Sequence, residues 1–192
     1  MRTLFVGDVH GCVDELAELL FVARPTRVIL IGDIFTKGPN PRGVWEIIQS
    51  VGAIAVLGNH DAFVLRNQSK FDLPEAAFDW LGALPLIIEE ENWIAVHAGI
   101  NPLGGVTSRR QALVLRRWPN DKDQSNPFWW ELYSGQKLVI YGHDAVRGLQ
   151  DNRPKSLGLD TGCVYGGRLT GYLLEEDILL QVNAKQVYCP IT

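Results

Sequence analysis

Every histidine in this sequence lies beside a glycine, an asparagine or an aspartate, or follows a strand-like run directly. The four are His10, His60, His97 and His143. An imidazole can bind a metal ion or transfer a proton near neutral pH, although a single histidine is usually a structural residue. Four in such similar settings are not expected from structural histidines alone. The pattern therefore favours one shared reactive site.

Carboxylate and amide side chains accompany these histidines. Asp8 precedes His10 by two residues, and in extended chain such side chains point the same way, so the pair can hold one ion. Asp33 and Asn59 follow two further strand-like runs. Oxygen and nitrogen ligands without thiolate suit Mn, Fe, Co or Zn better than a calcium cage or an iron–sulfur cluster. The predicted ligands are Asp8, His10, Asp33, Asn59, His97 and His143.

Six ligands are too many for one ion, so the sequence predicts two divalent ions that share Asp33. Two ions ~3.5–4 Å apart can activate a water and clamp the attacking and leaving oxygens of a phosphoryl transfer. His60 directly follows Asn59, and we expect it near the leaving group. There it either donates a proton or serves as a hydrogen-bond donor only. The predicted chemistry is hydrolysis of a phosphate bond.

These side chains need a scaffold that brings strand ends together. Strand-like runs at 3–6, 27–31 and 53–57 alternate with helical periodicity at 13–22 and 44–48, which predicts a βαβαβ unit with buried parallel strands. Ligand sites in open α/β folds form at the carboxyl edge of such a sheet. The polar residues that follow each strand are therefore expected at one edge.

The rest of the chain is predicted to be rich in strands, with helices at 59–65, 75–84 and 109–117. We expect the later strands to form a second mixed sheet packed on the first. They are the runs 86–89, 93–96, 138–141, 157–159, 169–174 and 178–181. An aromatic group in the poorly patterned stretch 101–134 is expected to be core, with a lid as the alternative. It comprises Trp118, Phe128, Trp129 and Trp130.

The composition sets the remaining limits. A chain of 192 residues, 46% of them apolar, fits one core and a single domain over 1–192. The net charge of −4 argues against general nucleic-acid binding, and no apolar run reaches the ~20 residues of a membrane span. The amino terminus reads as a strand, not a signal peptide, so we expect a cytoplasmic protein. Cys12, Cys163 and Cys189 lack the paired spacings of a disulfide framework or a thiolate zinc site.

Taken in order, the motifs resemble those of the calcineurin-like metallophosphoesterases. The chain has GD-x-HG at 7–11, GD-x(4)-G at 32–38, GNHD at 58–61, H-x-G at 97–99 and GH at 142–143. The resemblance implies a four-layer α/β/β/α sandwich of two mixed sheets and a site with two ions, most simply manganese. It assigns Asp8, His10 and Asp33 to the first ion, and Asp33, Asn59, His97 and His143 to the second. His60 is implied as the acid.

The segments 142–150 and 158–170 look like those of the ApaH-like phosphatases, relatives of the symmetrical diadenosine tetraphosphatases and the phosphoprotein phosphatases. Ser/Thr protein phosphatases carry Asp then Arg where this chain has Thr36 and Lys37. In them that Asp pairs with the acid histidine, so His60 is expected to lack an orienting carboxylate. The absence of this carboxylate is expected to matter least when the leaving group is a phosphate, whose pKa is ~6. The resemblance thus favours phosphoanhydride substrates, such as a dinucleoside tetraphosphate or polyphosphate.

The alternative substrates are a phosphoprotein, for a Ser/Thr protein phosphatase, and simple monoesters, for a broad phosphomonoesterase. Lys37 and Arg147 are predicted to contact the substrate phosphate, because they follow the expected ligands Asp33 and His143 by four residues. A solvent-exposed role is as plausible for the other arginines considered, which are Arg116, Arg117 and Arg168. The acidic composition of the chain argues against a nuclease. A metal-containing interaction module without catalysis is also disfavoured, because all seven expected site positions are filled.

Overall fold

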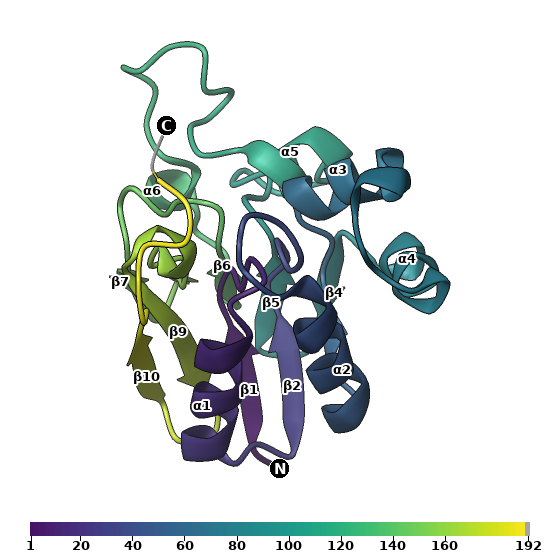
Figure 1. The fold of residues 1–192 in the computed structure, drawn as a ribbon. Helices are drawn as coiled ribbons and strands as arrows, with labels where there is room; N and C mark the ends of the chain where they lie inside the picture. The colour runs from purple at the N-terminus through teal and green to yellow at the C-terminus, as the bar shows by residue number, and fades with distance from the viewer. Residues whose placement is uncertain (191–192) are drawn as a thin grey trace.

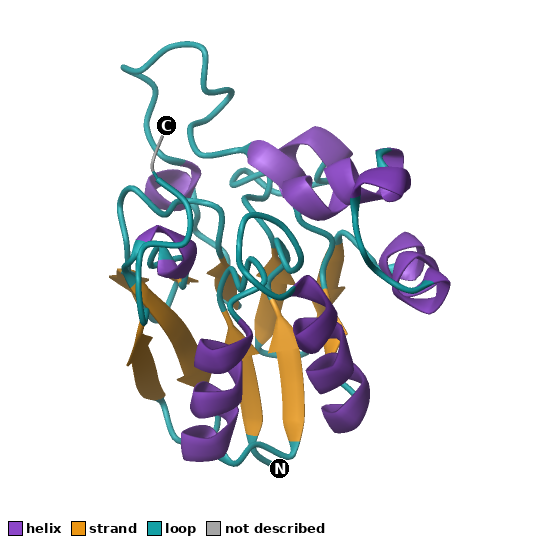
Figure 2. Cartoon of the chain, viewed as in Figure 1, coloured by secondary structure: helices purple, strands orange, loops and turns teal. Residues whose placement is uncertain are grey.

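Two mixed sheets form the centre of the computed structural model, which describes residues 1–190 (Figure 2). The first has the order β10-β9-β1-β2-β3. Strands β1, β2 and β3 are parallel, whereas β9 is antiparallel to β1 and β10 to β9. The bounds are β1 (Thr3–Val6), β2 (Arg27–Leu30), β3 (Ile54–Ala55), β9 (Arg168–Leu173) and β10 (Ile178–Asn183).

The assignment of 169–174 and 178–181 to the second sheet was wrong. These segments are β9 and β10, and β9 lies directly beside β1, with Phe5 opposite Tyr172. Without β9, the polar backbone of β1 would be an unpaired edge. The pairing also places the rings of Phe5 and Tyr172 6.5 Å apart in a stacked arrangement. Strand periodicity reveals which segments are strands but not which neighbour each one takes.

The second sheet has the order β4-β5-β6-β8-β7. Its central strands β5, β6 and β8 are parallel and both edge strands are antiparallel. The sequence did not predict β7, since its residues Gln-Asp-Asn lack any apolar pattern. The bounds are β4 (Ile87–Glu89), β5 (Trp93–Val96), β6 (Leu138–Tyr141), β7 (Gln150–Asn152) and β8 (Ser156–Gly158).

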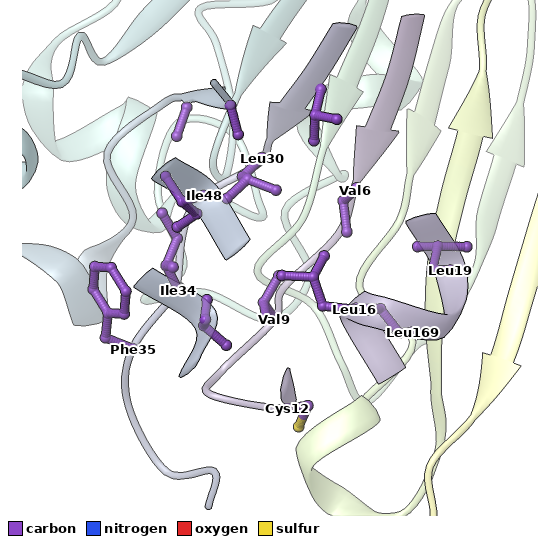
Figure 3. Packing of buried hydrophobic residues seen from close by; sticks show 14 of the residues in the cluster. Val6, Val9, Cys12, Leu16, Leu19, Leu30, Ile34, Phe35, Ile48 and Leu169 are labelled. Atoms are coloured by element: carbon purple, nitrogen blue, oxygen red, sulfur yellow. The ribbon is translucent and has the colours of Figure 1, made fainter. Parts of the chain in front are cut away.

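Helices α1 (Val13–Ala23) and α2 (Pro41–Val51) cover the outer face of the first sheet (Figure 1). The start of α2 is fixed because Asn40 accepts a hydrogen bond from the backbone N–H of Gly43 at 2.8 Å, with proline at the first helical position. The apolar side chains beneath α1 and α2 form the core cluster of Figure 3, which also includes Leu16 and Ile48.

A separate apolar layer fills the space between the two sheets, where Phe5 and Trp93 meet edge to face at 4.9 Å. The outer face of the second sheet is covered by short helices and their flanking segments, and Trp129 is fully buried there. The core interpretation thus holds for Trp129, whereas Trp118, Phe128 and Trp130 are half-buried. The segment between α5 and α6 extends away from the sheets (Figure 1).

The remaining helices are short, and the helix expected at 109–117 stops earlier, at Val114. They are α3 (Asn59–Arg66), η1 (Gln68–Lys70), α4 (Glu75–Ala83), α5 (Arg109–Val114), α6 (Trp129–Leu132) and η2 (Cys163–Tyr165). Within residues 1–190, every helix is too short or too polar to span a bilayer.

Candidate dinuclear metal centre

The residues that follow the parallel strands converge in two groups that share one carboxylate. Asp8, His10 and Asp33 offer ligand atoms that all lie within 4.8 Å of one another, and so do Asp33, His97 and His143. Asp33 Oδ2 is 3.7 Å from His10 Nε2, and Asp33 Oδ1 is 3.4 Å from His97 Nε2. The geometry therefore offers two adjacent cation sites with Asp33 between them.

The histidine rings are oriented through the nitrogen that faces away from the centre. His97 Nδ1 lies 2.8 Å from the carbonyl oxygen of Ile31, and His10 Nδ1 lies 2.9 Å from Thr36 Oγ1. Such contacts fix the ring and leave Nε2 for a metal. His143 Nε2 is buried without a hydrogen-bond partner in the described part of the chain. An imidazole nitrogen in that state fits a ligand position.

The backbone of three of these residues is left-handed. His10, Asp33 and His143 have φ values of 47°, 52° and 67°, a conformation that costs a non-glycine residue about 1 kcal/mol. The neighbouring turns are equally tight, because a side chain on Gly142 would collide with Asp8 Oδ1. Strain of this kind persists only where the surrounding structure enforces it, and it gathers at functional sites.

Asp61 holds the loop that carries Asp33. Its carboxylate accepts hydrogen bonds from the backbone N–H groups of Asp33 at 2.7 Å, Ile34 at 2.9 Å and Gly58 at 3.0 Å. The side chain is fully buried. In the sequence Asp61 stands out only as the last residue of the GNHD motif at 58–61, because its partners across the sheet edge are not visible in local spacing.

The electrostatics of the centre fit a cation. Burial raises the pKa of Asp8 well above its usual range, and the charges of Asp160 and Asp33 add to the effect. Burial likewise raises the pKa of Asp33 to about 7 and lowers the pKa of His97 and His143. Neutral imidazoles are the form that binds metals, and clustered carboxylates are stabilised in their ionised form by positive charge. The donor set therefore fits two divalent cations.

Asn59 and His60 begin α3, at the edge of the same centre. Asn59 Oδ1 lies 2.9 Å from His97 Nε2, and the backbone N–H of His60 donates to Asp33 Oδ1 at 2.8 Å. The His60 ring contacts the His10 ring edge to face at 5.2 Å. Burial, with the charges of Lys37 and His97, lowers the pKa of His60 to about 4. Its imidazole is consequently neutral at pH 7 in the free site.

A pocket of about 170 Å³ opens over the centre. Besides the expected Lys37, its walls include Asp160 and Tyr165, which the sequence reasoning did not place there, and Arg116, for which it left a phosphate contact and an exposed role open. Asp160 and Tyr165 belong to the segment 158–170, whose resemblance to the ApaH-like phosphatases could have marked them. No local pattern singles out Arg116.

The two arginines near the centre differ in position from what we expected. Arg147 does not line the pocket. Its guanidinium binds Asp144 at 2.8 Å and lies 4.1 Å from the centroid of the Phe128 ring. Arg116 lines the pocket instead, and its Nη2 donates to the carbonyl oxygen of His143 at 2.8 Å. Asp144 binds both guanidiniums, since Arg116 Nε lies 3.4 Å from its Oδ1. The spacing of Arg147 from His143 therefore did not predict which of the two arginines reaches the pocket.

This fold and site define a class of protein, and the comparison with known families agrees. The model of the calcineurin-like phosphoesterase family matches residues 1–158. The chain belongs to this family, and it is a hydrolase of the phosphatase type.

Within this family, the chain is similar in sequence to proteins named as symmetrical tetraphosphatases. The chain is 26% identical to the symmetrical bis(5'-nucleosyl)-tetraphosphatase of Dechloromonas aromatica, over 95% of this chain and 96% of that protein. It is 27% identical to the protein of the same name from Vibrio parahaemolyticus, over 96% and 99%. The alignment with the first spans 266 positions, more than the 192 residues here, so that relative contains additional segments.

Solved structures agree with the fold. A crystal structure described as that of a candidate diadenosine tetraphosphatase superposes with a TM-score of 0.88 and 31% identity, covering 95% of this chain and 93% of the other. A metallophosphoesterase from Sphaerobacter thermophilus has a TM-score of 0.62 and 18% identity, covering 96% and 89%. The expected arrangement of two mixed sheets with outer helices is confirmed.

Proposed function

We propose that this protein hydrolyses phosphoanhydride bonds, in a dinucleoside tetraphosphate or in inorganic polyphosphate. The observation that carries the proposal is the position of Thr36. Its hydroxyl contacts His10, not His60, and within residues 1–190 no carboxylate is hydrogen-bonded to the His60 ring. The relatives named as symmetrical tetraphosphatases support the same bond type.

The leaving group links this observation to the substrate. A serine alkoxide needs a proton as it departs, and His60 must supply it without a carboxylate to orient its ring. A departing phosphate has a second pKa of ~6 and can leave without that proton. The site therefore favours anhydrides over the alternative substrates, phosphoproteins and simple phosphate monoesters.

We propose that Asp8, His10 and Asp33 hold one divalent cation and that Asp33, Asn59, His97 and His143 hold the other, with manganese as the ion. When bound, such a pair supplies an activated water and offsets negative charge on the phosphate. Lys37 and Arg116 add positive charge at the pocket wall, where they can orient the non-bridging oxygens. His60 stands next to the ligands, in position to donate a hydrogen bond to the departing oxygen.

The size of the pocket defines what lies inside it. A volume of about 170 Å³ is below the roughly 300–1,000 Å³ of pockets that enclose drug-sized ligands. The pocket therefore takes a phosphoryl group, and the remainder of a larger substrate lies across the rim. Val146, which is 84% exposed, and Tyr165 form part of that rim.

The test is a substrate panel on metal-stripped protein reloaded with Mn, Co, Zn or Mg. Diadenosine tetraphosphate and tripolyphosphate should be cleaved with a higher kcat/KM than a phosphoserine peptide or an aryl phosphate, and Mn should restore the most activity. Faster turnover of the phosphoserine peptide would overturn the preference for anhydrides. Inactivity with every metal and substrate would overturn the hydrolase itself. The variant His97→Ala serves as the inactive control.

A further inference from the structure

Two of the three cysteines meet far from each other in sequence but close together in the fold. The sulfurs of Cys12 and Cys163 and a carboxylate oxygen of Glu15 all lie within 4.8 Å of one another. The residues are 0%, 1% and 0% exposed. The spacing of the cysteines gave no sign of a thiolate metal site, because the group is assembled only when η2 packs against the start of α1.

The local structure directs the three side chains to one point. Cys12 is the residue before α1, and Glu15 lies three positions later, in the first turn. Residues at this spacing lie on the same face of a helix. Cys163 opens η2 and belongs with Cys12 to the same apolar cluster. Figure 3 shows Cys12 at one end of this cluster, near Leu16.

Glu15 is the unusual member of the group. Its Oε1 accepts hydrogen bonds from the backbone N–H of Lys185 at 2.9 Å and from the Tyr188 hydroxyl at 2.8 Å. Its Oε2 is buried and has no hydrogen-bond partner anywhere in 1–190. A buried oxygen without a partner destabilises the fold, and more so when it is charged, because it has lost its hydration without gaining a hydrogen bond. Anchoring of the carboxyl-terminal segment accounts for Oε1 and leaves Oε2 unexplained.

We propose that Cys12, Glu15 and Cys163 form a separate binding site for a soft divalent cation, Zn²⁺ or Cd²⁺. Zinc binds sulfur at ~2.3 Å and carboxylate oxygen at ~2.0–2.2 Å, which places tetrahedral ligands about 3.8 Å apart. The ligand atoms here are at most 4.8 Å apart, so shifts of about 1 Å or less close the site. Each thiol releases its proton to solvent as its sulfur binds, and a water takes the fourth position.

The donor chemistry separates this site from the dinuclear centre. Thiolates select zinc and cadmium, whereas carboxylate, amide and imidazole ligands also accept manganese. The location gives the cation a structural role. Cys12 follows His10 by two residues, Cys163 precedes Tyr165 by two, and Glu15 holds the segment near Tyr188. One ion would tie all three segments together beneath the dinuclear centre.

The experiment is a cadmium titration of the reduced, full-length chain. The variant His97→Ala is used alongside the wild type to weaken the dinuclear centre, and the thiolate-to-cadmium charge-transfer absorption is recorded in the ultraviolet. Nitrogen and oxygen ligands do not give this band. We expect one equivalent per chain in both proteins, loss of the band in Cys12→Ser and Cys163→Ser, and an unchanged band in Cys189→Ser. That third cysteine is the matched control.

A second set of measurements keeps the proposal testable if the cysteine variants fold poorly. Glu15→Gln keeps an oxygen for Lys185 and Tyr188 but removes the charge, so cadmium affinity should fall at least tenfold while the far-ultraviolet circular dichroism is retained. Zn²⁺ should raise the Tm of His97→Ala but not that of the double variant Cys12→Ser/His97→Ala, in which both sites are weakened. Absence of the band, its persistence in Cys12→Ser, its loss in Cys189→Ser or unchanged affinity in Glu15→Gln would each overturn the proposal. None of these readouts depends on hydrolysis.

Discussion

Lys37 Nζ donates a hydrogen bond to the Tyr165 hydroxyl at 2.6 Å, and it lies 5.1 Å from the centroid of the Tyr165 ring. The two residues are 128 positions apart in sequence, and both line the pocket. A lysine ammonium lacks the rigid planar fork of an arginine. The phenol compensates by fixing the amine from one side, so that its remaining donors face the pocket.

Tyr165→Phe removes this hydrogen bond and keeps the ring. A net loss of about 1 kcal/mol should raise the KM for a phosphoanhydride about fivefold, with kcat changed less than twofold, because the ammonium is less well placed for binding. Steady-state kinetics on tripolyphosphate measure the split. Tyr188→Phe, which removes a hydroxyl outside the pocket, is the control. A fall in kcat at constant KM would contradict the positioning role.

His60→Ala tests the leaving-group argument. Proton donation by a positioned side chain contributes 10²–10⁴-fold, so an alkyl phosphate, which needs the proton, should lose at least about 100-fold in kcat. A phosphoanhydride should lose less than about tenfold. Initial rates on both substrates, with metal content checked on each preparation, give the comparison. Equal losses on the two substrates would mean that His60 acts in some other way.

We predict different effects on KM for alanine substitutions at Arg116 and Arg147. Arg116 lines the pocket, so Arg116→Ala should raise KM at least tenfold, given about 1.5–3 kcal/mol for a hydrogen bond to a charged group. Arg147→Ala should change KM less than threefold, since that guanidinium does not line the pocket. Both variants are measured on the same anhydride with thermal unfolding as the folding control. A larger effect at Arg147 would restore the prediction made from its spacing to His143.

Asp151 gives a pH-dependent contribution to stability away from the site. Arg153 binds its two oxygens at 2.8 and 2.6 Å, and these hydrogen bonds lower the pKa of Asp151. A carboxylate with a lowered folded-state pKa stabilises the fold above its unfolded pKa of ~3.9, and this is lost as pH falls through the folded value.

Asp151→Asn should therefore cost about 0.5–1 kcal/mol in the free energy of unfolding at pH 7. The difference from the wild type should shrink toward zero as the pH is lowered below about 3.9. Urea unfolding at a series of pH values measures it. Asp79→Asn, at an exposed position on α4, is the matched control. A constant difference at all pH values would exclude the ion pair as its cause.

The sequence by itself determined the strand ends and the residues that follow them. Short apolar runs that end at glycine and a polar residue are local signals, and parallel strands carry those residues to one edge whatever the details of packing. For this reason the members of the candidate centre, such as Asp33 and His97, could be selected before any coordinates. The same holds for helices α1 and α2, whose apolar periodicity is local, although α2 extends beyond the predicted 44–48 to Pro41–Val51.

The tertiary structure alone decided which distant segments meet. The pairing of β9 with β1, the bond between Lys37 and Tyr165, and the approach of Cys12 to Cys163 join residues more than a hundred positions apart. Likewise, Arg116 and not Arg147 lines the pocket, although Asp144 binds both guanidiniums. Such contacts depend on the packing of whole layers and on competition between partners. Neither the packing of layers nor this competition produces a periodic pattern or a residue spacing that can be recognised in the sequence.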